Sequence, residues 1–131
     1  MEKKEIESRE DVFLLVSTFY GKIKKDDFIG HFFLDAIPEN KWAQHIEKLT
    51  DFWQTNLFLI NKYKGNPMTV HTKLDEDYNY GITQEHFGKW LELWITTINE
   101  LFYGDKSEKA INSARNISFS LFLRMFKNRP K

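Results

Sequence analysis

The histidines are the residues of this sequence best suited to bind a metal ion, and His71 stands apart from the other three. It lies in the stretch GNPMTVHTKLDEDYNYG, residues 65–81, which has neither helical nor strand periodicity and separates two strongly periodic segments. Imidazole is a frequent metal ligand and changes its charge near neutral pH. His71 is therefore a candidate metal ligand, although a solvated loop histidine is the simpler interpretation.

Three further polar side chains fall on the apolar faces of predicted helices. His45 lies within the stripe of one helix, where a satisfied core histidine is more common than a ligand. Tyr20 and Trp90 lie on the apolar faces of two other helices. A buried O–H or N–H group needs a hydrogen-bond partner. These residues place polar groups on the inward faces of three helices, where they could contact a bound molecule.

The first half of the chain predicts helices that position these side chains. Ser8 is typical of a helix N-cap, and apolar residues follow at helical spacing from Val12 to Ile23. A short helical piece is expected within residues 27–38, and a second long helix from about Trp42 to Ile60. The apolar stripe of this second helix contains Trp42, His45, Ile46, Leu49, Phe52, Trp53, Asn56, Leu57 and Ile60.

The second half predicts two more helices and no strand. One helix begins near Thr83 and ends with Gly104 as its C-cap, and the last helix is capped by Ser107. The chain contains no internal repeat and no linker, so we expect one all-α domain over residues 1–131, with a core from about residue 10 to 126.

Composition narrows the range of functions. The net charge is zero, which gives no electrostatic reason to expect a nucleic acid or membrane partner. Without cysteine there is no thiolate ligand and no c-type haem attachment. The N-terminus does not resemble a signal peptide and no segment could span a membrane, so a cytoplasmic protein is expected. Aromatic residues make up 16% of the chain, which fits either a plain aromatic core or a cavity for a planar ligand.

Known metal and catalytic motifs are absent, but a series of short motifs resembles one family. The chain has no H-E-x-x-H, no cysteine–histidine cluster and no glycine-rich phosphate loop. The short motifs are FY (19–20), FF (32–33), W--H (42 and 45), FW (52–53), Y-G-P (63, 65 and 67), MTVH (68–71) and ITQEHFGKWLELW (82–94). Through these motifs the chain resembles the group III truncated haemoglobins from about residue 10 to 126, and it lacks the paired glycines typical of groups I and II.

The resemblance implies a truncated globin fold, a short helical sandwich around a b-type haem. It implies that His71 is the iron ligand, that Tyr20 and Trp90 are distal hydrogen-bond donors, and that His45 gates ligand access. It also implies that the apolar haem contacts are Phe33, Leu49, Phe52 and Trp53. The family usually joins the histidine to the next helix by a short link with proline, whereas the segment after Leu74 is longer and has none.

The functions implied by the resemblance involve small ligands at a five-coordinate iron: dioxygen, nitric oxide, carbon monoxide or cyanide. Two distal donors would favour oxygen or nitric oxide chemistry over oxygen transport, including nitric oxide dioxygenase or peroxidase-like activity supported by a reductase. Two alternatives stay open: a haem-based gas sensor, and a helical interaction module without a cofactor. A visible absorption spectrum separates the last of these from the others.

Overall fold

The described residues form a set of helices and one small pairing of strands. The computed structural model of the chain describes residues 2–59, 75–78 and 81–130. The helices are α1 (Arg9–Lys25), α2 (Gly30–Ala36), the short 3₁₀ helix η1 (Glu39–Lys41), α3 (Trp42–Phe58), α5 (Gln84–Leu101) and α6 (Asp105–Lys127). The predicted all-α class is confirmed. Among the helices of these residues, none combines the length and the apolar character needed to cross a membrane.

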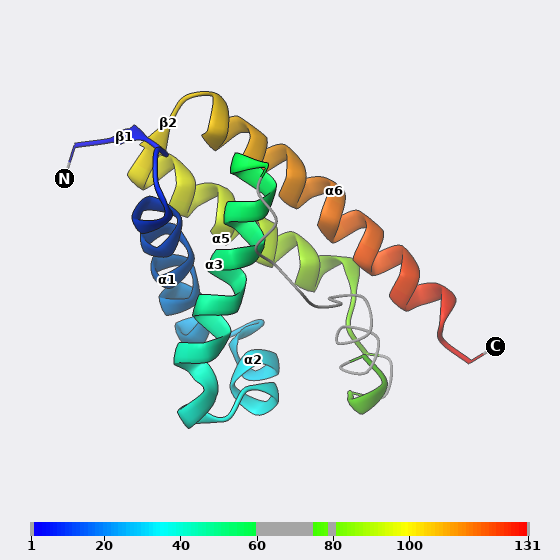
Figure 1. Cartoon of the computed structure of the whole chain (residues 1–131). Coiled ribbons are helices and arrows are strands. Elements are labelled where there is room, and N and C mark those ends of the chain that lie inside the picture. Colours follow the sequence, from blue (N-terminus) through cyan, green and yellow to red (C-terminus); the bar gives the residue numbers. More distant parts are fainter. Residues whose placement is uncertain (1, 60–74, 79–80, 131) are drawn as a thin grey trace.

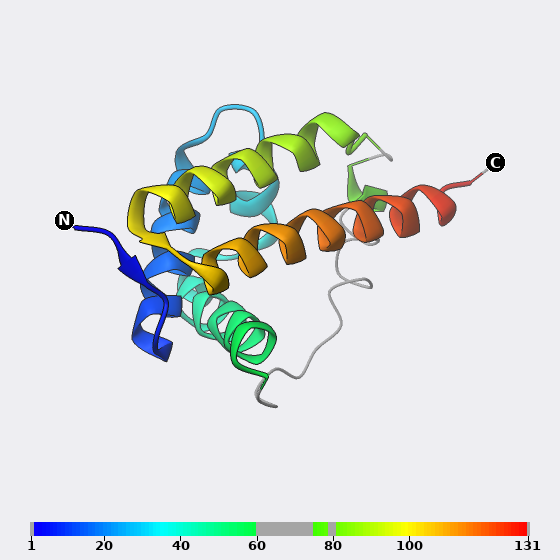
Figure 2. The ribbon, with the colours of Figure 1, turned by 90° about the horizontal axis from the view of Figure 1, so that it is seen from above.

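The long helices form two packed pairs. Helix α1 packs against α3, and α5 packs against α6, as Figure 1 shows. Seen from above in Figure 2, α5 and α6 lie side by side, and α1 also packs against α5. The side chains of Val16 and Ile23 on α1 and Ile98 on α5 are completely buried. The apolar stripes therefore meet between the two pairs, as the helical spacing in the sequence requires.

The predicted helix starts are correct at two positions. Ser8 is the N-cap of α1, and its side chain accepts a hydrogen bond from the backbone N–H of Asp11 at 3.4 Å. Thr83 is the N-cap of α5 and forms a capping box with His86. The helix predicted over 42–60 ends at Phe58, because Leu59 takes a left-handed conformation with φ of 57°. Local sequence signals are therefore sufficient to predict the two helix starts.

Three predictions around residue 104 are wrong. Helix α5 ends at Leu101, and residues 102–103 form strand β2 (Phe102–Tyr103), which pairs in parallel with β1 (Lys4–Glu5). Gly104 is the N-cap of α6 and not the C-cap of α5; its φ is 101°, and a Cβ atom there would lie 2.6 Å from Glu5 Oε1. Ser107 is a buried residue inside α6. The positive φ of Gly104, between β2 and α6, favours glycine, and the approach of the Glu5 side chain adds to this preference.

A buried ion pair connects the end of the chain to the start of α5. Asp75 is 1% exposed, and its carboxylate accepts hydrogen bonds from Arg129 Nε at 2.9 Å and Nη2 at 3.0 Å. It also accepts one from the backbone N–H of Ile82 at 3.3 Å, and Arg129 donates to the Ile82 carbonyl. We call this arrangement the Asp75–Arg129 clamp. It fixes residues just past α6 against the segment that leads into α5.

Candidate functional site

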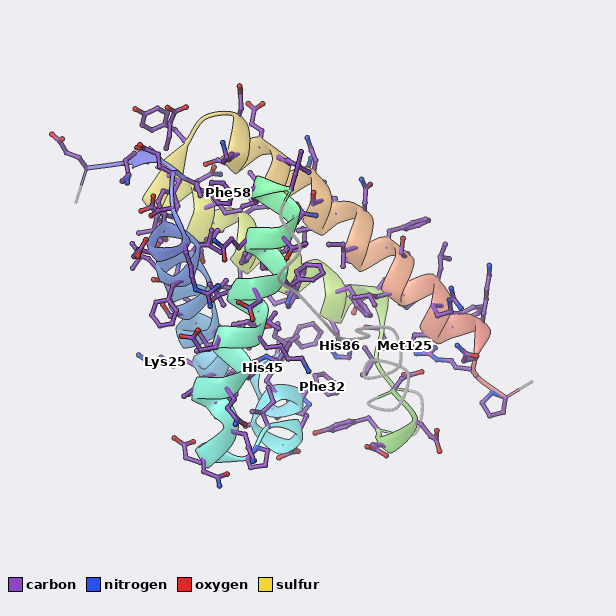
Figure 3. The ribbon with its side chains drawn as sticks, in the orientation of Figure 1. Lys25, Phe32, His45, Phe58, His86 and Met125 are labelled. Carbon is purple, nitrogen blue, oxygen red and sulfur yellow. The ribbon has the colours of Figure 1, made fainter. Side chains whose placement is uncertain are left out.

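A cavity of about 280 Å³ lies between the two helix pairs and α2. Figure 3 shows Phe32, His45, His86 and Met125, from four different helices, gathered around this region. Its lining is mostly aromatic and aliphatic, as in many ligand sites. The lining residues are Tyr20, Ile29, Phe32, Phe33, Ala36, Ile37, His45, Lys48, Leu49, Phe52, Trp53, Ile82, His86, Phe87, Trp90, Ile117, Ser118, Leu121 and Met125.

Every site residue named from the sequence lines this cavity, except His71. His71 lies outside the described residues. The residues brought together, from α1, α2, α3 and α5, are Tyr20, Phe33, His45, Leu49, Phe52, Trp53 and Trp90. Residues that are far apart in the chain thus share one apolar space.

The hydroxyl of Tyr20 and the indole of Trp90 lie close together at the cavity wall. Tyr20 is 3% exposed; burial raises the pKa of its hydroxyl well above the usual range, and the indole N–H of Trp90 partly offsets this rise in pKa. Because an indole N–H can only donate, the Tyr20 oxygen is the acceptor toward Trp90. The phenol therefore keeps its own proton, and that O–H remains available as a donor toward a ligand.

His45 stands between the cavity and a shallow depression on the surface. Its ring lies 5.1 Å from that of Tyr20 and 5.6 Å from that of Trp42, edge-on to both. The depression is lined by His45 together with Lys41 and Lys48. A side chain in this place can control access from the surface, so the expected role of His45 as a gate stays a prediction.

His86 is a cavity residue that the sequence analysis did not single out as part of the site. Its Nδ1 accepts a hydrogen bond from the backbone N–H of Thr83 at 2.8 Å, so the neutral ring carries its proton on Nε2. Partial burial, and then the charge of nearby His31, lower the pKa of His86. The spacing of four residues between His86 and Trp90, on one helical face, is the signal that could have identified it.

The aromatic walls fit a flat apolar group with a metal at its centre better than a bare metal ion. The Trp53 and Trp94 rings stack at 4.6 Å with an interplanar angle of 27°, which fixes the wall behind the cavity. Among the described residues, no group of three or more His, Cys, Asp or Glu side chains could hold a metal ion. Aromatic walls of this kind suit a flat apolar ligand that carries its own metal, as a porphyrin does.

Comparison with known proteins agrees with this geometry. No protein-family model matches the chain. It is 29% identical over 113 residues to the group 3 truncated hemoglobin of Campylobacter jejuni, covering 85% of both sequences. The crystal structure of group III truncated hemoglobin from Campylobacter jejuni matches with a TM-score of 0.85 at 26% identity, over 99% of this chain and 100% of that one.

A second solved structure supports the same fold. The 2/2 hemoglobin from Synechococcus sp. PCC 7002, in the cyanomet state with covalently attached heme, matches with a TM-score of 0.67 at 25% identity. The match covers 93% of this chain and 94% of that one. The resemblance to the group III truncated haemoglobins is confirmed, and the fold is that of the 2/2 truncated globins.

Proposed function

We propose that this chain is a haem protein of the group III truncated haemoglobin type that binds dioxygen and related diatomic ligands. The haem would be haem b, held without a covalent bond, with His71 as its iron ligand. The observation that carries the proposal is the closeness of buried Tyr20 to half-buried Trp90 at the wall of an aromatic cavity. The similarity to proteins named as truncated hemoglobins supports it.

The cavity residues divide into those that would hold the haem and those that would contact its ligand. Phe33, Leu49, Phe52 and Trp53 supply apolar surface for the macrocycle, and Lys48 at the rim is a candidate partner for a propionate. When bound, a haem with one imidazole ligand supplies an iron with an open position for a diatomic molecule. The apolar walls keep water from that position, which strengthens the hydrogen bonds made within it.

Tyr20 would be the direct donor to the ligand, and Trp90 would orient it. In the role we propose, the indole N–H faces the phenol oxygen as a donor, which leaves the phenol proton free to turn toward the cavity. A hydrogen bond to a charged acceptor contributes ~1.5–3 kcal/mol. A ligand with partial negative charge, such as dioxygen, is therefore held and released slowly. Slow release favours chemistry on dioxygen or peroxide, such as oxidation of nitric oxide to nitrate, over oxygen transport.

Titration of the purified, haem-free chain with haemin is expected to give an intense Soret band that saturates at one haem per chain. Filling the cavity should also raise the melting temperature, by roughly 10 °C at a hundredfold excess over Kd. Metal-free protoporphyrin IX is the matched control, because it fills the cavity and cannot be ligated. Absence of a saturable Soret band would leave the cofactor-free interaction module as the better explanation.

Tyr20→Phe is expected to speed dioxygen release by at least ~10-fold, because the lost hydrogen bond contributes 1.4 kcal/mol or more. Flash photolysis and stopped-flow measurements of the ferrous protein give the dissociation rates directly. Carbon monoxide, which is nearly uncharged when bound, is the control ligand and should leave at almost the same rate from both proteins. Equal acceleration for both ligands would point to a steric effect and contradict the role given to Tyr20.

Trp90→Phe should act in the same direction and more weakly, because it removes the group that orients Tyr20 and not the donor itself. In a Tyr20→Phe background the Trp90 substitution should then have little further effect on dioxygen release. Non-additivity of this kind is expected of two residues that act through one contact. Fully additive effects would mean that each residue contacts the ligand independently.

A further inference from the structure

The outward face of the second half of α6 exposes large apolar side chains. Phe119 and Phe126 are each 59% exposed, and Leu123 is 38% exposed. Their spacing of four and three residues puts them on one stripe of the helix. In Figures 1 and 2, α6 runs along the edge of the molecule, with its partner helix α5 on one side only. We call this stripe the outer α6 face.

Positive charge flanks the outer α6 face without local compensation. Arg115, Arg124 and Lys127 are exposed, and no ion pair among the described residues includes them. From residue 109 to 131 the sequence contains no Asp or Glu, and residues 60–74 contain none either. Asp75, the acidic residue that reaches this end of α6, is already paired with Arg129.

The opposite side of the same helical segment lines the cavity. Ile117, Leu121 and Met125 alternate with the exposed residues along α6 and contribute to the cavity wall. An α-helix with its side chains is ~10 Å across. A molecule bound on the outer α6 face would therefore be separated from the contents of the cavity by the width of one helix.

We propose that the outer α6 face is the docking site of an acidic protein that donates one electron to this chain. This inference rests on the proposed haem function, since the electron would reduce ferric haem to ferrous haem while the donor's cofactor loses one electron. No bond or proton transfer accompanies the step. A small apolar centre within a charged rim suits the weak, transient encounters of electron-transfer proteins, which bury less than ~1,200 Å².

Two other occupants fit the observations less well. A second copy related by a two-fold axis would place Arg115, Arg124 and Lys127 against the same cations, and like charges oppose such an interface. An anionic membrane surface would attract the cations, but binding there grows with the apolar area inserted, and the other face of α6 is committed to the core. An acidic electron-donor protein accounts for all three observations: the positive charge around the outer α6 face, the limited apolar area of the face, and its position one helix width from the cavity.

Reduction by a plant-type [2Fe–2S] ferredoxin, an acidic one-electron donor, tests the proposal. The haem-loaded ferric protein is mixed with reduced ferredoxin under carbon monoxide, and formation of the ferrous carbonyl spectrum is followed by stopped flow. The second-order rate should fall as salt is raised. The double variant Arg115→Glu/Lys127→Glu should lower the second-order rate at least ~10-fold at low salt. The double variant Phe119→Ser/Phe126→Ser should also lower this rate, but with little change in its salt dependence.

Lys3→Glu/Lys25→Glu is the matched control, because it changes the net charge equally at exposed positions away from the outer α6 face. It should alter the rate less than ~2-fold, since the local field and not the net charge would steer the donor. Equal slowing by both charge-reversal variants would overturn the proposal, as would a wild-type rate that does not depend on salt. Absence of reduction by ferredoxin would overturn it too.

Binding measurements separate this proposal from the haem function on which it rests. Calorimetric titration with oxidised ferredoxin needs no electron transfer, and it should show binding to the wild type that weakens at least ~10-fold in Arg115→Glu/Lys127→Glu. A chain that takes up no haem but shows this pattern would refute the haem function and keep the docking site. Sedimentation with vesicles of equal parts phosphatidylglycerol and phosphatidylcholine should show no binding of the wild type. If the wild type does bind the vesicles, and Arg115→Glu/Lys127→Glu or Phe119→Ser/Phe126→Ser abolishes this binding, the outer α6 face is a membrane site instead.

Discussion

Arg129→Met is expected to lower the free energy of unfolding by ~3–5 kcal/mol, because it leaves the carboxylate of Asp75 buried without its counter-charge. Asp75 is 1% exposed, and its carboxylate accepts two hydrogen bonds from the guanidinium group of Arg129. Methionine keeps much of the apolar stem of arginine, so lost packing contributes little to the change. Urea unfolding followed by far-UV circular dichroism measures the effect.

Two variants determine whether the charge is responsible for this loss. Lys127→Met removes a nearby cation that forms no ion pair in the described part of the chain, and should change stability by less than ~0.5 kcal/mol. Adding Asp75→Asn to Arg129→Met removes the buried charge, and should restore part of the lost stability. A loss below ~1 kcal/mol in Arg129→Met would show that solvent reaches the clamp and that the pair contributes as little as a surface pair.

His71→Ala is expected to abolish the five-coordinate ferrous haem spectrum. We propose His71 as the iron ligand because the resemblance to the group III truncated haemoglobins implies it; His71 lies outside the described residues. Free imidazole added at millimolar concentration should restore the spectrum by occupying the vacated space. Optical and resonance Raman spectra of the ferrous protein, with the iron–imidazole stretching band as the marker, report the bond directly.

His86→Ala is the informative comparison for His71, because His86 is also an imidazole at the cavity. Its Nδ1 is engaged in the cap of α5, and its Nε2 carries the proton, so the neutral ring is poorly placed to ligate iron. The His86 variant should therefore keep the five-coordinate spectrum. If the spectrum instead survives in His71→Ala and disappears in His86→Ala, the iron ligand has been assigned to the wrong histidine.

The sequence predicts those parts of the fold that depend on neighbouring residues. The Ser8 cap and the start of α5 at Thr83 follow from side chains within one turn of each helix end. The inward faces of α1, α3 and α5 follow from helical spacing, and this spacing is enough to turn Tyr20, His45 and Trp90 toward the interior. Such features need no knowledge of which helices pack together.

Contacts between distant residues account for the wrong or missing predictions. Gly104 follows a helical stripe, so it resembles a C-cap, whereas its positive φ between β2 and α6 and the approach of Glu5 are what favour glycine there. The clamp joins Asp75 to Arg129 with no periodic signal to connect them. The closeness of Trp90 to Tyr20 depends on how α1 packs against α5, so the sequence suggests two donors without showing that one lies beside the other.

The parallel pairing of β1 with β2 has a consequence for synthesis of the chain on the ribosome. Lys4 is synthesised long before its partner Phe102. Until Phe102 is made, strand β1 has no strand partner, and closing so long a loop is slow compared with forming any single helix. Strand β1 is therefore a late part of the nascent protein to find its place, although it is made before all the helices of the described residues.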